Sequence, residues 1–276
     1  RFIKKNKNTI LDNLTNKKII FCGLEKKFIQ ECIFVVDSSG SKNVVNEMYK
    51  YKIKTFVTNS SDFKVDKYLI SNFLNKITSK DKVFSTSICD ATAIYPVIKL
   101  IDDIKSIANG HITTIHPWLS YQNLLDGNME SMQLTNHYVK DFELGRKSTE
   151  TLIPKSTSVL EAISKFDKKI VKNLTSFSLR SPHPIVSSAI VSLNLKNTFK
   201  NEKELIKIFE DTKKLNIHFS EPHNVSSDYI ESNYACIIQK DQIKINNNVI
   251  NLMLWYDNEF GYSYQVCEMI KGILKL

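Results

Sequence analysis

The sequence predicts an α/β region followed by an α+β region, with the boundary near residue 89. In the first third of the chain, short apolar segments alternate with helical segments, which is the pattern of a parallel sheet with right-handed crossovers. From about residue 112 the strands become longer and follow one another with helices grouped between them, which favours a mostly antiparallel sheet. The 276 residues are 42% hydrophobic and 24% charged, so each region has enough apolar residues for its own core.

The first region is expected to contain three strands, at 33–36, 55–57 and 82–85. Residues 33–36 are all apolar, as in a strand that is buried on both faces of a parallel sheet. The polar turn 37–40 that follows is expected to cap a helix over about 42–51. A second helix is expected at 93–104 from its apolar period, and Pro96 is acceptable there because it would lie near the first turn.

The second region is expected to contain five strands, at 112–115, 176–180, 189–195, 234–238 and 249–256. Three helices are expected among and after them, at 158–166, 202–214 and 263–274. Asn201 and Glu204 have the spacing of a capping box at the start of the second of these helices. This arrangement predicts an α+β domain that ends in a helix.

The net charge of +9 comes from 38 basic and 29 acidic residues, and only three of the basic residues are Arg. Proteins that read nucleic acids favour Arg forks, so the scattered Lys residues are expected to be solvated surface and no nucleic-acid partner is expected. No apolar run reaches the roughly 18 residues of a membrane helix, and no signal segment follows Arg1. We therefore expect a cytoplasmic protein that contacts no membrane and lacks its natural first residue.

Five cysteines, at 22, 32, 89, 236 and 267, include no C-x-x-C pair, so neither a disulfide framework nor a metal site is expected. Cys22, Cys32, Cys236 and Cys267 are expected to be small core residues in a reducing compartment. Cys89 lies between an expected strand and an expected helix. A thiol at a helix N-terminus faces the positive end of the dipole, which stabilises a thiolate, and the backbone donors there can stabilise an oxyanion. A buried structural cysteine is the alternative.

Two further residues stand at strand ends. His116 precedes Pro117, and a neutral imidazole at that position can take a proton from a thiol or a hydroxyl. Cys89 and His116 therefore form a candidate pair of nucleophile and base. Arg180 precedes a turn with two prolines, where a guanidinium can bind an anionic group in a forked geometry. A structural histidine and a structural salt bridge are the alternatives for these two residues.

Several segments carry a resemblance to a known family. WYDNEFGYS at 255–263 matches a C-terminal signature almost letter for letter. STSICDAT at 85–92 resembles the nucleophile segment SNASCTTN, and TTIH at 113–116 resembles TTVH. Weaker matches are LIPKST to IIPSST, LRSPHPIVS to FRVPTPNVS and DSSG to ESTG. In this order, from about residue 30 to the end, the chain resembles the glyceraldehyde-3-phosphate dehydrogenase family, which includes erythrose-4-phosphate dehydrogenase.

The resemblance implies a partial, Rossmann-like dinucleotide-binding domain at 1–88 and a catalytic domain with a C-terminal helix at 89–276. It also implies NAD as cofactor and a homo-oligomer, by resemblance a tetramer. Cys89 matches the cysteine that attacks the aldehyde, and His116 matches the histidine that assists it. The matched binding residues are Arg180 and Thr157 for anions, Asn258 for the nicotinamide, and Ser39, Gly40 and Thr58 at the border of the dinucleotide.

Two departures from the family pattern matter. The sequence contains no G-x-G-x-x-G run, so we expect either a fragment of a longer protein or a loss of ordinary NAD binding. At the anion sites, Asp90 and Ile88 replace hydroxyl residues beside the thiol, and Leu119 and Tyr121 replace threonines after His116. A carboxylate at position 90 would repel phosphate and raise the thiol pKa.

The leading hypothesis is NAD-dependent oxidation of an aldehyde, phosphorylated in the family pattern, through a thioester on Cys89. Within this class, the thinned anion sites favour release of a free acid, with Asp90 beside the substrate. The alternative from another class is a catalytically inert paralogue with a structural or oligomer-assembly role. Binding of NAD distinguishes the two classes, because an enzyme must bind the dinucleotide and an inert paralogue need not.

Overall fold

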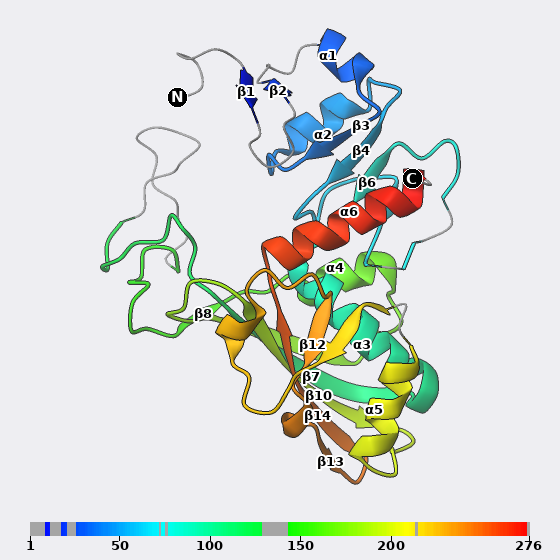
Figure 1. Cartoon of the computed structure of the whole chain (residues 1–276), viewed down its shortest axis with the longest axis vertical. Helices are drawn as coiled ribbons and strands as arrows, with labels where there is room; N and C mark the ends of the chain where they lie inside the picture. Colours follow the sequence, from blue (N-terminus) through cyan, green and yellow to red (C-terminus); the bar gives the residue numbers. More distant parts are fainter. Residues whose placement is uncertain are drawn as a thin grey trace.

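Two β-sheets organise the chain, and each lies with its own helices in Figure 1. The computed structural model describes residues 9–11, 18–20, 26–71, 73–74, 77–128, 143–212 and 215–274. The first sheet is parallel and the second is mixed and mostly antiparallel, so the expected succession of an α/β region and an α+β region is confirmed.

The parallel sheet has four strands in the order β3-β4-β6-β5. Its elements are β3 (Phe34–Asp37), α2 (Lys42–Met48), β4 (Lys54–Val57), β5 (Lys67–Tyr68) and β6 (Val83–Ser85). Three elements before it were not expected from the sequence: the antiparallel pair β1 (Thr9–Leu11) and β2 (Lys18–Ile20), and α1 (Lys26–Glu31). The strands predicted at 33–36, 55–57 and 82–85 are confirmed to within one residue at each end.

The expectation that the strand at 33–36 is buried on both faces is wrong. Ile33 is 78% exposed and Val36 is 45% exposed. The reason is the strand order: among the described residues, β3 pairs only with β4 and forms one edge of the sheet. An apolar run in the sequence cannot distinguish an edge strand from a central one.

Helix α3 (Cys89–Lys105) follows the parallel sheet and begins at Cys89 itself, four residues before the predicted start. We expected Pro96 to lie near the first turn of this helix. It lies instead inside the helix. Proline in a helix interior removes one backbone hydrogen bond, which destabilises the helix. Packing of the proline ring in the core offsets this cost. Pro96 is buried together with its neighbours Tyr95 and Val97.

The mixed sheet has the strand order β11-β12-β14-β10-β7-β9-β8, and β13 pairs with β14. The pairs β7–β9 and β11–β12 are parallel and the other pairs are antiparallel. Its strands are β7 (Ile107–His116), β8 (Ile153–Lys155), β9 (Leu174–Arg180), β10 (Ser187–Leu195), β11 (Ile217–Phe219), β12 (Cys236–Ile238), β13 (Lys244–Asn246) and β14 (Val249–Tyr256). The remaining helices of this region are α4 (Val159–Phe166), α5 (Glu202–Asp211) and two short 3-10 turns, η2 (Ser226–Tyr229) and η3 (Lys240–Gln242).

One hydrophobic core fills the space between the mixed sheet and helices α3, α4 and α5. Ile94 and Ile98 of α3 and Ile163 of α4 are fully buried in it. At the start of α5, the side chain of Asn201 accepts a hydrogen bond from the backbone N–H of Glu204, as expected. The reciprocal half of the capping box is absent, because the Glu204 carboxylate accepts from the backbone N–H of Lys200.

Helix α6 (Phe260–Leu274) returns the C-terminal end of the chain to the parallel sheet. Figure 1 shows this helix, in red, between the blue parallel sheet and the mixed sheet. Its residues Met269 and Ile270 share a core with Phe56 of β4 and Phe84 of β6, whose rings stack at 5.3 Å. The two regions of the chain are thus joined by packing as well as by sequence.

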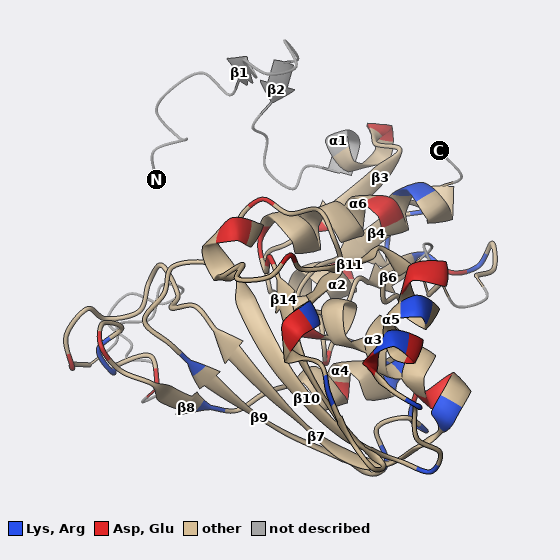
Figure 2. Ribbon diagram, turned by 60° about the horizontal axis from the view of Figure 1, so that its bottom comes forward, with Lys and Arg blue, Asp and Glu red and all other residues tan. Residues whose placement is uncertain are grey.

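Charges of both signs occur along α3, α5 and α6 (Figure 2), and this mixture fits the expectation of a solvated lysine-rich surface. Within the described ranges, none of the helices has the length and apolar character that crossing a membrane requires.

Candidate active site

The ends of three strands and the start of one helix meet at Cys89. The chain leaves β6, passes through 86–88 and enters α3 at Cys89. His116 and Arg180 are register partners at the ends of the parallel strands β7 and β9. Because parallel strands end at the same edge of a sheet, these two side chains lie side by side, and each is only 9% exposed. The structure thus brings the predicted nucleophile, base and anion-binding arginine into one region.

Asp90 is the centre of the hydrogen bonds in this region. Its Oδ2 lies 3.2 Å from Nε2 of His116, and its Oδ1 accepts a hydrogen bond of 2.9 Å from the hydroxyl of Tyr256. The thiol of Cys89 donates to the same Oδ1 at 3.4 Å. On its other side, Nδ1 of His116 lies 3.2 Å from Oγ of Ser187. Cys89 and His116 are therefore connected through Asp90, and no direct hydrogen bond joins them among the described residues.

The electrostatics of the site follow from burial and from this carboxylate. Burial raises the pKa of the Cys89 thiol well above its usual range, and the negative charge of Asp90 raises it further. Burial alone would also raise the pKa of Asp90, but the charge and hydrogen bond of His116 and the hydrogen bond of Tyr256 outweigh it and lower that pKa to about 2. The backbone N–H of Asp90 at the helix start lowers the pKa of the thiol, as expected, but burial and the Asp90 carboxylate outweigh it, so the expectation of a net thiolate is wrong for this structure.

The other cysteines follow the expectation of core residues only in part. Cys236 is fully buried and burial raises its pKa. Cys32 and Cys267 are exposed, so the core prediction is wrong for both. Cys32 follows the short helix α1 and Cys267 lies on α6. Each has one acidic and one apolar neighbour in the sequence, which does not distinguish a surface position from a core position. Cys22 lies outside the described residues.

A polar cavity of about 430 Å³ opens beside Asp90. Arg180 and Thr157, the two residues that the resemblance assigns to anions, both line it, as do Leu119 and Tyr121 at the positions of the missing threonines. Nη1 of Arg180 donates a hydrogen bond of 2.6 Å to the carbonyl of Pro117, which fixes the orientation of the guanidinium. The cavity has the positive charges of an anion site, and its hydroxyl groups come from Tyr121, Ser156, Thr157 and Ser158, with none at Leu119.

Lys155 is a residue of this cavity that sequence reasoning did not single out. It ends β8 and lines the cavity together with Arg180, Glu143 and Glu161. Burial lowers its pKa, the charge of Asp90 opposes this, and the charge of Arg180 lowers it again. A signal was present in the sequence, because Lys155 stands where the resembled motif IIPSST has a serine. Tyr256 and Ser187 were also missed as partners, since nothing in their local sequence shows which groups they face.

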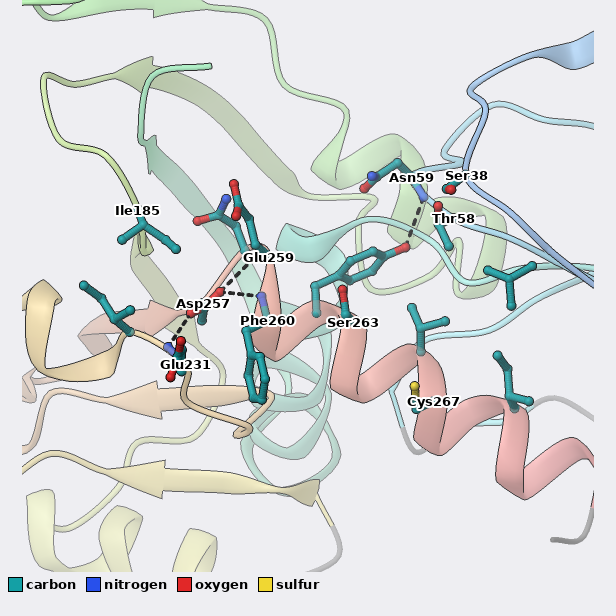
Figure 3. Close-up of a pocket in the computed structure, with 16 residues that line it drawn as sticks. Ser38, Thr58, Asn59, Ile185, Glu231, Asp257, Glu259, Phe260, Ser263 and Cys267 are labelled. Atoms are coloured by element: carbon teal, nitrogen blue, oxygen red, sulfur yellow. Dashed lines mark hydrogen bonds between the residues drawn. The ribbon is translucent and has the colours of Figure 1, made fainter. Parts of the chain in front are cut away.

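A second, larger cavity of about 780 Å³ lies between the parallel sheet and α6. In Figure 3, Thr58 comes from the end of β4, while Ser263 and Cys267 come from α6. The predicted residues Thr58 and Asn258 both line this cavity. Oδ1 of Asn258 is buried and has no hydrogen-bond partner among the described residues, which makes it available to a ligand.

Two other residues predicted at the dinucleotide border, Ser39 and Gly40, do not line this cavity, whereas their neighbour Ser38 does. Oγ of Ser39 accepts a hydrogen bond from the backbone N–H of Ser41. Gly40 has a positive φ of 68°, the conformation that glycine adopts most easily, so its role in the structure is that of the turn into α2.

The segment that carries Asn258 is held by its neighbours. Oδ1 of Asp257 accepts hydrogen bonds from the backbone N–H groups of Glu259 and Phe260, which caps the start of α6. Oδ2 accepts from the N–H of Glu231, and Figure 3 shows this carboxylate between the two segments. A Cβ at Gly261 would lie 2.8 Å from the carbonyl oxygen of Ser232, so only glycine fits this close approach. These contacts explain the local sequence around Asn258.

The residues present fit the nicotinamide end of NAD better than its phosphates. The apolar cavity, the hydroxyls of Ser38 and Thr58 and the free oxygen of Asn258 suit an aromatic ring with a carboxamide. No G-x-G-x-x-G run occurs in the sequence to hold a pyrophosphate. In the described part of the chain, no three His, Cys, Asp or Glu side chains are grouped as metal ligands.

Comparisons with known proteins agree with this geometry. A family model described as the C-terminal domain of glyceraldehyde 3-phosphate dehydrogenase matches residues 88–258. A glyceraldehyde-3-phosphate dehydrogenase-like protein of Pseudomonas aeruginosa (strain UCBPP-PA14) is 31% identical over 202 residues, which cover 71% of this chain and 42% of that protein. Glyceraldehyde-3-phosphate dehydrogenase 2 of Agaricus bisporus is 29% identical over 249 residues, 88% of this chain and 71% of the relative. Glyceraldehyde-3-phosphate dehydrogenase 3 of Saccharomyces cerevisiae is 30% identical over 204 residues, 72% of this chain and 59% of the relative.

Proposed function

The chain belongs to the glyceraldehyde-3-phosphate dehydrogenase family, and we propose that it carries the catalytic part of an NAD-dependent aldehyde dehydrogenase. The observation that carries the proposal is the meeting of Cys89, at the first position of α3, with His116 and Arg180 at the ends of two neighbouring strands. Covalent aldehyde oxidation through a thiol uses a base and donors for the oxyanion, which His116 and the helix N-terminus supply. The guanidinium of Arg180 suits an anionic group on the substrate.

In the proposed reaction, the sulfur of Cys89 forms a bond to the carbonyl carbon of the aldehyde as the C=O π bond breaks. The thiol proton passes to the carbonyl oxygen, which becomes the hydroxyl of a hemithioacetal. The backbone N–H groups at the start of α3 stabilise the oxygen during the attack. His116 then takes the proton of the hemithioacetal hydroxyl as the carbon loses a hydride and becomes a thioester. NAD, when bound, supplies the hydride acceptor. Water or phosphate cleaves the thioester and restores the thiol.

The substrate would lie in the cavity beside Asp90. Arg180, Thr157 and Lys155 line this cavity and supply two positive charges and a hydroxyl. A phosphorylated aldehyde fits these donors, because a guanidinium binds phosphate in a forked geometry. Asn258, Thr58 and Ser38 would hold the nicotinamide end of the cofactor in the neighbouring cavity.

The test uses the protein that carries this chain, with glyceraldehyde 3-phosphate and unphosphorylated glyceraldehyde as matched substrates. Formation of NADH should require the phosphorylated aldehyde, and Cys89→Ser should abolish it because serine is a far weaker nucleophile at neutral pH. Cys32→Ser, at an exposed cysteine far from α3 in the sequence, is the control and should leave the rate unchanged. Asn258→Ala should weaken NAD binding, whereas Asn109→Ala on β7 should not.

A second candidate function is an inert member of the family that serves assembly or binding. The hydrogen bond from the Cys89 thiol to Asp90 favours it, because a protonated thiol is a poor nucleophile. A protein that neither binds NAD nor oxidises either aldehyde would support this candidate over the enzyme.

Assembly into a homo-oligomer, by resemblance a tetramer, is part of both candidates. Four neighbouring strands of the mixed sheet place one register partner each on a shared face of the sheet. These residues are Phe177, Thr113, Ile190 and Met253. Phe177 is 50% exposed and Ile190 is 41% exposed. Two exposed apolar side chains on one face of the sheet suit a contact between copies of the chain. Light scattering with size-exclusion chromatography measures the number of copies, and Ile190→Lys should reduce it.

The expected cytoplasmic location also stays a prediction.

A further inference from the structure

Asp90 makes contacts that set the protonation of the groups around it. The side chain is 4% exposed and lies in the first turn of α3. Its two oxygens contact His116, Tyr256 and the thiol of Cys89 at 3.2, 2.9 and 3.4 Å. No other carboxylate among the described residues has a hydrogen bond to the thiol.

The positions of the protons follow from the charge of this carboxylate. The pKa of Asp90 is low, so at neutral pH the group is ionised and can only accept hydrogen bonds. Nε2 of His116 must therefore carry a hydrogen, which it donates to Oδ2. The thiol of Cys89 likewise keeps its proton and donates it to Oδ1. Nε2, which bonds to the carboxylate next to Cys89 in the sequence, thus already carries a hydrogen and cannot accept the proton of Cys89.

We propose that Asp90 is a positioning residue that keeps Cys89 as a protonated thiol and His116 turned to the carboxylate in the resting protein. The proposal concerns the nucleophile of the proposed function, but it requires neither NAD nor aldehyde oxidation. It predicts that Cys89 reacts slowly with electrophiles at neutral pH, and that the reactivity rises when the charge at position 90 is removed.

The other charged and titratable groups around Cys89 do not cancel this effect. Three of these groups interact electrostatically with Cys89 itself: Lys155 of β8, Tyr256 of β14 and Tyr262 of α6. Two others act on its neighbours, because His116 of β7 acts on Asp90 and Arg180 of β9 acts on Lys155. Among the causes acting on the thiol, burial and the charge of Asp90 are the largest and both disfavour the thiolate. The charge of Lys155 favours it and is the smallest of these causes. The net direction is a protonated thiol.

The experiment measures the rate at which iodoacetamide alkylates Cys89 between pH 6 and pH 10, by mass spectrometry of the peptide that contains it. In the unchanged protein the midpoint should lie above the ordinary thiol value of 9.0. Asp90→Asn keeps the shape of the side chain and removes its charge. It should lower the midpoint by about one unit or more, which means an alkylation rate at pH 7.5 that is about tenfold higher. Cys32 and Cys267, measured in the same digest, should not change.

Glu161→Gln is the matched control, because Glu161 lines the same cavity and has no hydrogen bond to the thiol. It should change the alkylation rate less than about twofold, since an exposed charge is screened by water. Asp90→Thr is the second variant and should act in the same direction as Asp90→Asn.

Three results would overturn the proposal. The first is a folded Asp90→Asn or Asp90→Thr variant, as judged by circular dichroism, with an unchanged alkylation profile. The second is an equal rate increase in Glu161→Gln. The third needs no variant and therefore decides the case even where both substitutions prevent folding: a midpoint in the unchanged protein at or below the ordinary thiol value. Failure to bind NAD or to oxidise an aldehyde would contradict the proposed function and leave this inference standing.

Discussion

The hydroxyl of Tyr256 donates a hydrogen bond of 2.9 Å to the carboxylate of Asp90, although 166 positions separate the two residues in the sequence. Tyr256 is the last residue of β14, and Asp90 lies in the first turn of α3. The contact therefore ties the strand that leads to Asn258 to the helix that begins with Cys89. Both side chains are nearly fully buried, so the bond stabilises the charged form of Asp90 where hydration by water is reduced.

The charge and hydrogen bond of His116, together with the hydrogen bond of Tyr256, predict a pH dependence of stability. The pKa of Asp90 falls from 3.8 to about 2 on folding, so the unfolded chain binds the proton more tightly than the folded protein does. The resulting stabilisation is present above about pH 4 and is lost as the pH falls through the folded value. It should amount to about 2 kcal/mol in the free energy of unfolding, since one pKa unit corresponds to about 1.4 kcal/mol.

Urea denaturation between pH 5 and pH 2 measures this contribution. Asp90→Asn should remove it, so that the variant loses less stability than the unchanged protein over this range. Asp211→Asn, at an exposed carboxylate on α5, is the control and should preserve most of the slope. Equal slopes in the unchanged protein and in Asp90→Asn would show that the folded pKa of Asp90 is close to its ordinary value.

The role of His116 as the base can be separated from a structural role. His116→Asn retains a side chain that can hydrogen-bond but cannot take up a proton. If His116 assists the proposed oxidation, turnover should fall by about a hundredfold or more, because a positioned base contributes about that factor. His111→Asn is the matched control on the same strand, since His111 bonds only to Thr175 at 2.8 Å among the described residues. An unchanged rate together with a lower melting temperature would make His116 a structural residue.

Gly261 is predicted to hold the Asn258 segment in place. A methyl group at this position would lie 2.8 Å from the carbonyl oxygen of Ser232, so Gly261→Ala must displace backbone. We expect a loss of about 1–3 kcal/mol in the free energy of unfolding, the usual cost of overpacking. Gly127→Ala is the control, because the nearest atom there is a side-chain nitrogen of Asn123 at 3.6 Å. It should stay within about 0.5 kcal/mol of the unchanged protein in urea denaturation, and an equal loss in both variants would contradict the close contact at Gly261.

Much of this arrangement could be predicted from the sequence, and the failures have physical causes. Local sequence patterns predict that Cys89 lies at a helix start and that His116 and Arg180 lie at strand ends. These patterns can be seen in the sequence because they involve only neighbouring residues. The strands β8 and β11 have three residues each, too few to show a period. The exposure of Val36 depends on which strands lie beside β3.

The hydrogen bonds of Asp90 show the same limit at the candidate site. Cys89 is its direct neighbour in the sequence, so the repulsion between the Asp90 carboxylate and a Cys89 thiolate could be predicted from the sequence. Its partners His116 and Tyr256 lie 26 and 166 positions away. Only the fold shows that these two donors meet the carboxylate and that Nε2 of His116 bonds to Asp90 and not to the thiol.

The same carboxylate leads to a prediction about how the thioester is cleaved. Asp90, Glu143 and Glu161 line the cavity that inorganic phosphate would have to enter, and Oε1 of Glu143 already accepts a hydrogen bond from the backbone N–H of Ser156. Each charge-assisted bond that phosphate cannot form lowers its binding by about 1.5–3 kcal/mol, whereas water needs none of them. We therefore expect an active form to release a free acid, with an initial rate that changes little with phosphate concentration at constant ionic strength. Leu119→Thr, which returns a hydroxyl to the cavity, should increase the dependence on phosphate. A saturable, many-fold activation of the unchanged protein by phosphate, with an acyl phosphate as product, would contradict the prediction and favour phosphorolysis.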